Sequence, residues 1–408
     1  MSNQHLSDYF DGFVIKRLSA VEADPLTSHQ HEFNGVRALK DLLGTEKAVY
    51  DARFVYLSEE ETEDLATSAR LTWYDARIAH PTRSEFRLYF ETNAVLEQAV
   101  EGDLLFIGKT PSGEVLIVVA EANSPAEKQL LWLFRLDKTM QESFLFTEHA
   151  NFQRVGISFI ERHFLENLGV ATIAYQGALL DQILKTFGPT FPRTKDFSAF
   201  ARSLVTDTNP VTDPDETLMK WLDQEEIIFR TLERHIVSEK LTAGFNNDVD
   251  GFISYSLGVQ NRRKSRAGHA FENHLQQIFV ENHVAFTRGG TTENNSKPDF
   301  IFPGMGSYTD DGFPHELLTM LAAKTSCKDR WRQILTEAQR INQKHLITLE
   351  PGISESQTDE MKANRVQLIS PQSVQGSFST QQQEWLISVE EFMFIVKDKQ
   401  SSPRLALI

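Results

Sequence analysis

The hydrophobic pattern changes near residue 160, and this change limits the fold more than any other feature of the sequence. The first 130 residues contain apolar runs of strand length, namely FRLYFE (86–91), DLLFIG (103–108) and VLIVVAEA (115–122). The segment KTPSGE between the last two marks a hairpin turn. From about 160, apolar residues recur at helical spacing, as in YQGALLDQILKTF (175–187). The pattern predicts a mainly-β domain followed by helices.

The last third of the chain alternates between helix and strand patterns. The order of apolar segments predicts a helix over 265–283, strands over 298–303 and 317–324, and a helix over 327–341. Two further short strands and a closing helix over 383–396 complete the chain. Strands separated by helices in this way predict a mixed or parallel α/β sheet.

These patterns divide the chain into three parts. A β-rich domain is expected over 1–170, a helical linker region over 171–216 and an α/β domain over 217–408. The polar segment TDTNPVTDPDE, which ends the linker, is the clearest loop in the chain and precedes a long helix over 217–241.

Composition limits the function without deciding it. The formal net charge of −16 argues against binding nucleic acid over the whole surface, although residues 256–346 hold 12 Lys and Arg against 9 Asp and Glu, a local charge of +3. No apolar run approaches the roughly 18 residues of a membrane span, so no membrane partner is expected. The N-terminus lacks the pattern of a secretory signal. A single cysteine predicts a reducing, cytoplasmic setting.

Carboxylates and a lysine occur where the predicted strands of the last third begin or end. Asp299 starts one strand, Lys324 ends the next, and Glu337 lies 13 residues later on a predicted helix. Glu272 lies on the preceding helix beside apolar positions. Such carboxylates can hold Mg²⁺, and a neighbouring lysine can act on a water molecule, as phosphodiester hydrolysis requires. On spacing alone this signal is weak, because a carboxylate at a strand edge is more often solvated or capping.

Several motifs add a resemblance to a known family. NRRKSRAG (261–268), Glu272, KPDFIFP (297–303) and AAKTSCKDRWRQIL (322–335) closely resemble the C-terminal catalytic domain of the EcoRII-like restriction endonucleases. These belong to the PD-(D/E)xK nucleases that cut CCGG-like and CCNGG-like sites. The similarity spans about 255–350 and fades over the last 60 residues.

The resemblance implies specific catalytic roles. Asp299, Lys324 and Glu337 fit a permuted motif whose second acidic residue lies on the helix after the lysine, and Glu272 matches the helix glutamate of the family. Mg²⁺ would be held by Asp299, Glu337 and Glu272, and Lys324 would act on the attacking water. Tyr308 corresponds to a tyrosine of the family, and a place near the scissile phosphate and a packing role are both open.

The resemblance also implies how DNA is read. Lys328, Asp329 and Arg330 would enter the major groove and read adjacent G·C pairs, a task that suits their donors and acceptors. A local alternative for Asp329 is a capping box with Ser326. Among the basic residues nearby, a phosphate contact or a solvated surface position is open for Arg332, Arg262, Arg263, Lys264 and Arg266. Trp331 and Cys327 are interpreted as packing residues.

The N-terminal similarity is thinner. YFDGFVIKRLSA (9–20) and TRSEFR (82–87) resemble the family's effector domain, a β-pseudobarrel that binds a second copy of the target DNA. By position, His29, Arg83 and Glu85 would face DNA, although they could also be ordinary surface residues. Asn34 and Pro81 depart from the family's contact positions, which leaves open both the sequence that is read and whether unmodified DNA is bound.

The sequence therefore predicts a type II restriction endonuclease that makes Mg²⁺-dependent double-strand cuts at a short CC/GG-containing site. Cutting both strands of a palindromic site requires two active sites, so at least a homodimer is expected. Two alternatives remain: a nuclease that depends on methylated or otherwise modified DNA, and a non-catalytic DNA-binding protein.

Overall fold

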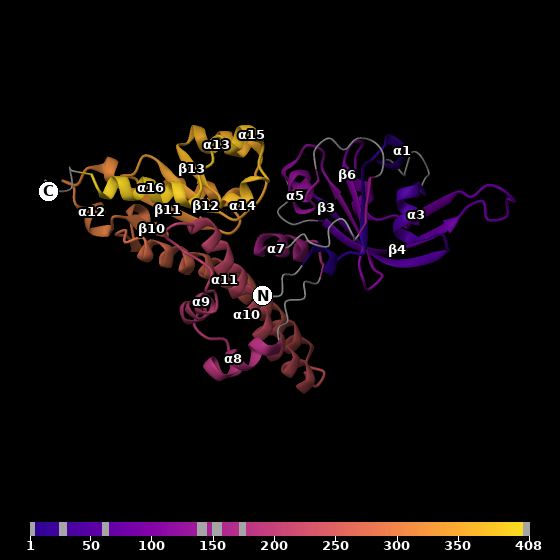
Figure 1. Ribbon diagram of the computed structural model, residues 1–408, viewed down its shortest axis with the longest axis horizontal. Coiled ribbons are helices and arrows are strands. Elements are labelled where there is room, and N and C mark those ends of the chain that lie inside the picture. The colour runs from indigo at the N-terminus through magenta and orange to yellow at the C-terminus, as the bar shows by residue number, and fades with distance from the viewer. Residues whose placement is uncertain are drawn as a thin grey trace. The chain divides into compact units, whose positions relative to one another are not determined.

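The computed structural model describes residues 5–23, 31–58, 65–136, 145–148, 157–170 and 177–402, without the side chains of 145–148, 177–178 and 328–329. The chain divides into two compact units, Met1–Thr172 (unit 1) and Ile173–Ile408 (unit 2) (Figure 1). In the part of the chain that the structure describes, no helix combines the length and the apolar character that crossing a membrane requires.

Unit 1 contains an eight-stranded sheet in the order β2-β5-β4-β3-β7-β6-β1-β8. Every neighbouring pair is antiparallel except β3 and β7, which are parallel. The strands are β1 (Gly12–Arg17), β2 (Glu32–Asn34), β3 (Ala48–Leu57), β4 (Leu65–Asp75), β5 (Phe86–Phe90), β6 (Leu104–Lys109), β7 (Val115–Ala120) and β8 (Leu145–Glu148). The predicted hairpin over 103–122 is confirmed as the antiparallel pair β6 and β7.

Both faces of this sheet are covered, which explains the continuous apolar runs of β6 and β7. One core contains Phe54 and Trp73, and the other contains Phe13 and Phe106. The helices of the unit are η1 (Leu6–Asp8), α1 (Ala20–Ala23), α3 (Arg37–Leu43), α4 (Ala94–Gln98), α5 (Pro125–Leu133) and α7 (Phe159–Asn167).

Unit 2 begins with four helices, α8 (Gly177–Phe187), α9 (Thr194–Ser203), α10 (Pro214–Ala243) and α11 (Val249–Glu281). Asp213 caps α10 by accepting a hydrogen bond from the Glu216 amide, and Pro214 occupies its first turn, so the polar loop signal marks a helix start. The predicted linker over 171–216 is not separate, because α8 and α9 pack against α10 through a shared apolar cluster that includes Phe197 and Phe229.

The second part of unit 2 is a mixed five-stranded sheet in the order β13-β12-β11-β10-β9, as the alternating pattern predicts. Strands β11, β12 and β13 are parallel, and β10 runs antiparallel to both β11 and β9. The strands are β9 (Thr287–Arg288), β10 (Phe300–Phe302), β11 (Thr319–Lys324), β12 (Lys344–Thr348) and β13 (Val366–Ile369). The remaining helices are η2 (Glu293–Asn295), α12 (Met305–Thr309), η3 (His315–Leu317), η4 (Lys328–Thr336), α13 (Glu355–Ala363), α14 (Gln372–Gln375), α15 (Thr380–Gln383) and α16 (Val389–Gln400).

Helices α11 and α16 cover the same face of this sheet. Phe279 of α11 and Phe392 of α16 both contact Phe302 of β10, at ring-centroid distances of 5.1 and 5.8 Å. Strand register places Phe302 opposite Thr319, on the other face from Lys324. The end of β11 that carries Lys324 therefore presents its side chain away from these two helices.

Three predicted helices differ from the structure in type or extent. The segment 327–341 forms the 3₁₀ helix η4, which ends at Thr336, and the following residues turn back toward β12. The predicted helix over 383–396 is interrupted, because Ile387 bridges to Ile369 at the edge of the sheet and α16 begins only after the Ser388 cap. The helix predicted over 265–283 begins earlier, at Val249.

Candidate active site

The ends of two antiparallel strands bring Asp299 and Lys324 together. Asp299 directly precedes β10, whose first residue, Phe300, pairs with Leu321 of β11. Asp299 Oδ2 accepts hydrogen bonds from Lys324 Nζ at 2.9 Å and from the Ala323 amide at 2.7 Å. The two side chains are 16% and 24% exposed, so the ion pair lies at the surface of the unit and remains accessible.

Glu337 joins this pair from the end of η4. Its backbone is extended, so the side chain projects from the segment after the helix and not from a helix as predicted. Burial raises the pKa of the Glu337 carboxyl, the positive charge of Lys324 opposes this shift, and the negative charge of Asp299 adds to it. Glu337 therefore lies within range of the charges of Lys324 and Asp299. Its Oε2 atom is buried and has no hydrogen-bond partner among the described residues.

Packing of η4 fixes where Glu337 emerges. Trp331 and Ile334 on the helix and Ala338 directly after Glu337 are fully buried, as expected for Trp331. The start of η4 is held by Glu350, whose Oε2 accepts hydrogen bonds from the Cys327 amide at 2.5 Å and from Ser326 Oγ at 3.3 Å. The predicted capping box is therefore wrong: Cys327 is the N-cap and makes no side-chain cap hydrogen bond.

Two residues expected at the site have other partners. Glu272 on α11 pairs with Arg288 of β9, with 2.8 Å between Oε2 and Nη2, and Arg288 lies opposite Phe300 on the sheet face turned away from Lys324. The buried Tyr308 donates its hydroxyl to Glu293 Oε2 at 2.5 Å. Burial and this bond raise the pKa of Tyr308. Neither residue is brought to Asp299, so the packing role of Tyr308 is the one that the contacts support.

The predicted base-reading segment lies at the start of η4. Arg330 is exposed there, whereas the side chains of Lys328 and Asp329 lie outside the described residues. Arg332 stacks over the Trp331 ring and pairs with Glu360 of α13, with 2.6 Å between Nη2 and Oε2. The hydrogen bond from Arg332 lowers the pKa of the Glu360 carboxyl. Because this pair is about half exposed, a phosphate could compete for the guanidinium.

The predicted phosphate clamp on α11 is partly internal. Arg266 is buried and pairs with Glu226 and, at 3.8 Å, with Glu225 of α10. Arg263 donates to Glu233 of α10, with 2.7 Å between Nη2 and Oε2. Both arginines therefore join α10 to α11, and the buried Arg266 in particular is not available to a phosphate. Three basic residues of the run remain exposed: Arg262, which stacks over Phe191, Arg263 and Lys264.

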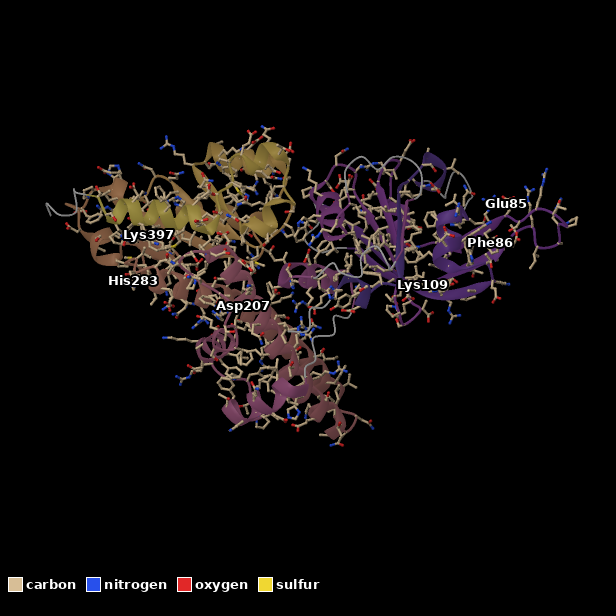
Figure 2. The ribbon with its side chains drawn as sticks, viewed as in Figure 1. Glu85, Phe86, Lys109, Asp207, His283 and Lys397 are labelled. Carbon is tan, nitrogen blue, oxygen red and sulfur yellow. The ribbon has the colours of Figure 1, made fainter. Side chains whose placement is uncertain are left out.

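In unit 1 the predicted DNA contacts lie at the start of β5. Arg83 is exposed, and its amide donates to His80 Nδ1 at 3.1 Å. Glu85 lies next to Phe86 in unit 1 (Figure 2). It forms ion pairs with Arg77 and Arg87. The hydrogen bond from Arg87 holds the pKa of the Glu85 carboxyl below its usual value. His29 lies outside the described residues.

Sequence reasoning missed the side chains that bind the backbone of residues 337–339. The Lys344 ammonium donates to the backbone carbonyls of Glu337 and Ala338, and Glu293 accepts a hydrogen bond from the Gln339 amide at 3.2 Å. A lysine that begins the apolar run HLITL was the available signal, since a charged residue in a buried strand requires partners.

The site suits a hard divalent cation in part. Asp299 and Glu337 supply carboxylate oxygens, and the unpartnered Oε2 of Glu337 is the kind of atom that a cation would satisfy. Glu272 does not join them. Over the described ranges no group of three or more His, Cys, Asp or Glu side chains is placed to hold a metal ion.

Comparison with known proteins gives matches to restriction enzymes. Residues 229–393 match the family model described as EcoRII C terminal. Over 167 residues the chain is 47% identical to the type II restriction enzyme EcoRII of Escherichia coli, and the alignment covers 41% of each protein.

Two solved structures are also similar to this chain. Metal-depleted Ecl18kI in complex with uncleaved DNA is 17% identical, with a TM-score of 0.45, over 54% of this chain and 82% of that one. The complex of restriction endonuclease PspGI with substrate DNA is 15% identical, with a TM-score of 0.44, over 53% and 97%. From the family match and the 47% identity, residues 229–393 of this chain resemble the EcoRII C-terminal family, and the chain spans less than half the length of the curated relative that it matches.

Proposed function

We propose that the chain is a type II restriction endonuclease that cuts both strands of DNA at a short CC/GG-containing site. The observation that carries this proposal is the ion pair of Asp299 and Lys324 at two strand ends, with Glu337 beside it and an exposed Arg330 on the adjacent η4. Carboxylates and a lysine at the same strand end suit phosphodiester hydrolysis.

Each residue has a distinct task in this reaction. The Lys324 ammonium, anchored by Asp299, donates a hydrogen bond to the attacking water or to a phosphate oxygen and offsets negative charge there. Asp299 and Glu337 would hold Mg²⁺, which lowers the pKa of a bound water and stabilises the developing charge on the phosphate. The water adds to phosphorus and loses its proton, while the bond to the departing ester oxygen breaks and that oxygen gains a proton.

DNA recognition and assembly complete the proposal. Lys328, Asp329 and Arg330 at the start of η4 would read the G·C pairs, and the exposed Arg262 and Lys264 would contact phosphates. A homodimer would supply two active sites for the two strands. Unit 1 would bind effector DNA through the surface that includes Arg83 and Glu85.

A cleavage assay tests the proposal directly. Purified protein with Mg²⁺ should cut unmethylated phage DNA, and end sequencing should show one short CC/GG-containing site. Cutting of methylated DNA alone would identify a modification-dependent nuclease instead. DNA binding without any cutting would identify a non-catalytic binding protein.

Lys324→Ala provides the residue-level test. Loss of a group that acts on the attacking water should lower the cleavage rate by about 10²- to 10⁴-fold with DNA affinity retained. Lys397→Ala is the matched control (Figure 2), because Lys397 is also partly buried in unit 2 but donates to Asn282 Oδ1, at 2.6 Å. The control should cut at the rate of the unaltered protein, and an equal loss in both variants would contradict the assignment of Lys324.

A further inference from the structure

We infer that Lys344, together with Thr292 and Glu293, is a positioning group that fixes the backbone of residues 337–339 and so aims the Glu337 carboxylate at Asp299 and Lys324. This inference rests on the proposed nuclease function. It concerns residues that lie behind Glu337 and that do not touch the attacking water.

Strand register puts Lys344 on the same face of the sheet as Lys324. The two neighbouring strands β11 and β12 are parallel, and Lys324 pairs with Thr348. Lys344 lies four residues before Thr348 in β12, and side chains two or four residues apart on a strand point to the same face. The segment from η4 to β12, which contains Glu337, therefore has one lysine near its carboxylate and another near its backbone.

The contacts of Lys344 are with the main chain. Lys344 is the first residue of the buried strand β12 and is only 5% exposed. Nζ donates to the carbonyl oxygen of Glu337 and, at 2.6 Å, to that of Ala338. Ala338 has φ of 46°, in the left-handed region that a residue with a Cβ rarely adopts. An ammonium with several donors can satisfy two carbonyls that such a turn brings together.

Two residues at η2 bind the amides of the same segment: Thr292, directly before this helix, and Glu293, its first residue. The Ala338 amide donates to Thr292 Oγ1 at 3.3 Å, and the Gln339 amide donates to Glu293 Oε2 at 3.2 Å. Burial lowers the pKa of the Lys344 ammonium to about 8, and the negative charge of Glu293, followed by that of Glu337, opposes this shift. The backbone after Glu337 is thus fixed by a cation at its carbonyls and by side-chain oxygens at its amides.

These contacts of Lys344, Thr292 and Glu293, here called the brace, matter because the Glu337 carboxylate itself is weakly held. The buried Oε2 of Glu337 has no hydrogen-bond partner within the described ranges, so the position of the side chain depends on the backbone that carries it. A displacement of about 1 Å in a catalytic group can cost about 100-fold in rate. Loss of the brace should therefore reduce catalysis and cation binding without removing any group that contacts DNA.

Lys344→Met in the full chain tests the inference. Methionine keeps the apolar length of the side chain but not the ammonium. We expect a single-turnover cleavage rate about 100-fold lower and a higher half-saturating Mg²⁺ concentration. DNA affinity, measured with Ca²⁺ in place of Mg²⁺, should remain as in the unaltered protein. A second readout is calorimetric Mg²⁺ binding to the DNA complex in an inactive Lys324→Ala background, where Lys344→Met should weaken binding.

Lys399→Met is the matched control. Lys399 lies in α16 of the same unit and is partly buried, and its Nζ donates to the Leu318 carbonyl at 3.1 Å and to Thr319 Oγ1 at 3.0 Å. The Lys399→Met substitution therefore removes a comparable ammonium, but from a backbone carbonyl that lies away from Glu337. Its cleavage rate and Mg²⁺ dependence should be those of the unaltered protein.

Thr292→Val decides the question if thermal melting shows that Lys344→Met does not fold. It removes the acceptor of the Ala338 amide with little change in shape, and it should lower the rate and raise the half-saturating Mg²⁺ concentration. A folded Lys344→Met, or Thr292→Val in its place, with unchanged rate and unchanged Mg²⁺ dependence would overturn the inference. Failure of the unaltered protein to cut any DNA would instead overturn the proposed function.

Discussion

His345 follows Lys344 in β12 and points to the opposite face of the sheet, where its ring lies 5.3 Å from that of Phe392. The residue is 2% exposed. Burial lowers the pKa of its imidazole to about 3, the charge of Lys399 adds to this shift, and a hydrogen bond with the Met320 backbone partly opposes it. The folded protein therefore keeps His345 neutral over a pH range in which the unfolded chain protonates it.

A stability measurement against pH checks this shift. Because the folded pKa lies below the ordinary value of 6.5, the stabilisation is complete above pH 6.5 and declines as pH falls from there toward about 3. Replacing His345 by Gln should remove one proton from this dependence, which flattens the free energy of unfolding by about 1.4 kcal/mol per pH unit in that window. Parallel curves for the two proteins in urea unfolding experiments would contradict the shift.

At the scale of single residues, sequence reasoning selected Asp299, Lys324 and Glu337, which the fold brings together, because their motifs lie where strands begin or end. It could not assign Glu272 correctly, since only the fold shows that Arg288 of β9 binds it. Lys344 was missed for the same reason: its two acceptors are backbone carbonyls, which leave no trace in a sequence.

Among the elements, α10 and α11 are joined by a seam of charges. Arg263 and Arg266 of α11 face Glu225, Glu226 and Glu233 of α10. The sequence shows a basic run and a separate acidic helix, and both patterns are typical of solvated surfaces. Only the antiparallel packing of the two helices turns them toward each other (Figure 1).

Arg266→Ala measures how much the charge pairs between α10 and α11 contribute to stability. It removes a buried cation that pairs with Glu225 and Glu226, while Arg230 still pairs with Glu226, so it should cost about 3 kcal/mol in the free energy of unfolding. Lys264→Ala, on an exposed position of the same helix, should change stability by less than about 0.5 kcal/mol. If Lys264 contacts a phosphate, its loss should reduce the slope of log affinity against log salt by about 0.9. A stable Arg266→Ala variant would show that the seam is dispensable.

The start of η4 depends on Glu350 and not on a residue of the helix itself. Glu350→Ala leaves the buried Cys327 amide without its acceptor, which should cost about 1–3 kcal/mol in thermal or urea unfolding. Ser326→Ala is the control: its hydroxyl is exposed and makes only the longer bond to Glu350, so stability should change little. Equal losses in the two variants would contradict the assignment of Glu350 as the group that holds the start of η4.

The whole molecule consists of two units that each contain their own sheet and buried core. The sequence predicted two such bodies because periodicity changes between them. It assigned 171–216 to a separate linker region, because the packing of α8 and α9 against α10 involves residues distant in sequence.

A fragment of residues 173–408 should therefore fold alone. Its core, helical hairpin and sheet lie within unit 2. We expect one cooperative calorimetric transition, close to one of the transitions of the full chain. A fragment that melts without cooperativity would show that unit 2 depends on unit 1.

The 3₁₀ geometry of η4 has a consequence for where DNA would be cut. At about 2.0 Å per residue, the seven residue steps from Arg330 near one end to Glu337 just past the other span about 14 Å. Under the proposed function, such a helix would act as a ruler that sets the distance between the residue that reads bases and the residue near the cut. Inserting one residue would rotate Glu337 by about 120° away from Lys324, whereas inserting three would restore its direction and lengthen the ruler by about 6 Å. The length of this short helix would then set the offset between the sequence that is recognised and the phosphate that is cut.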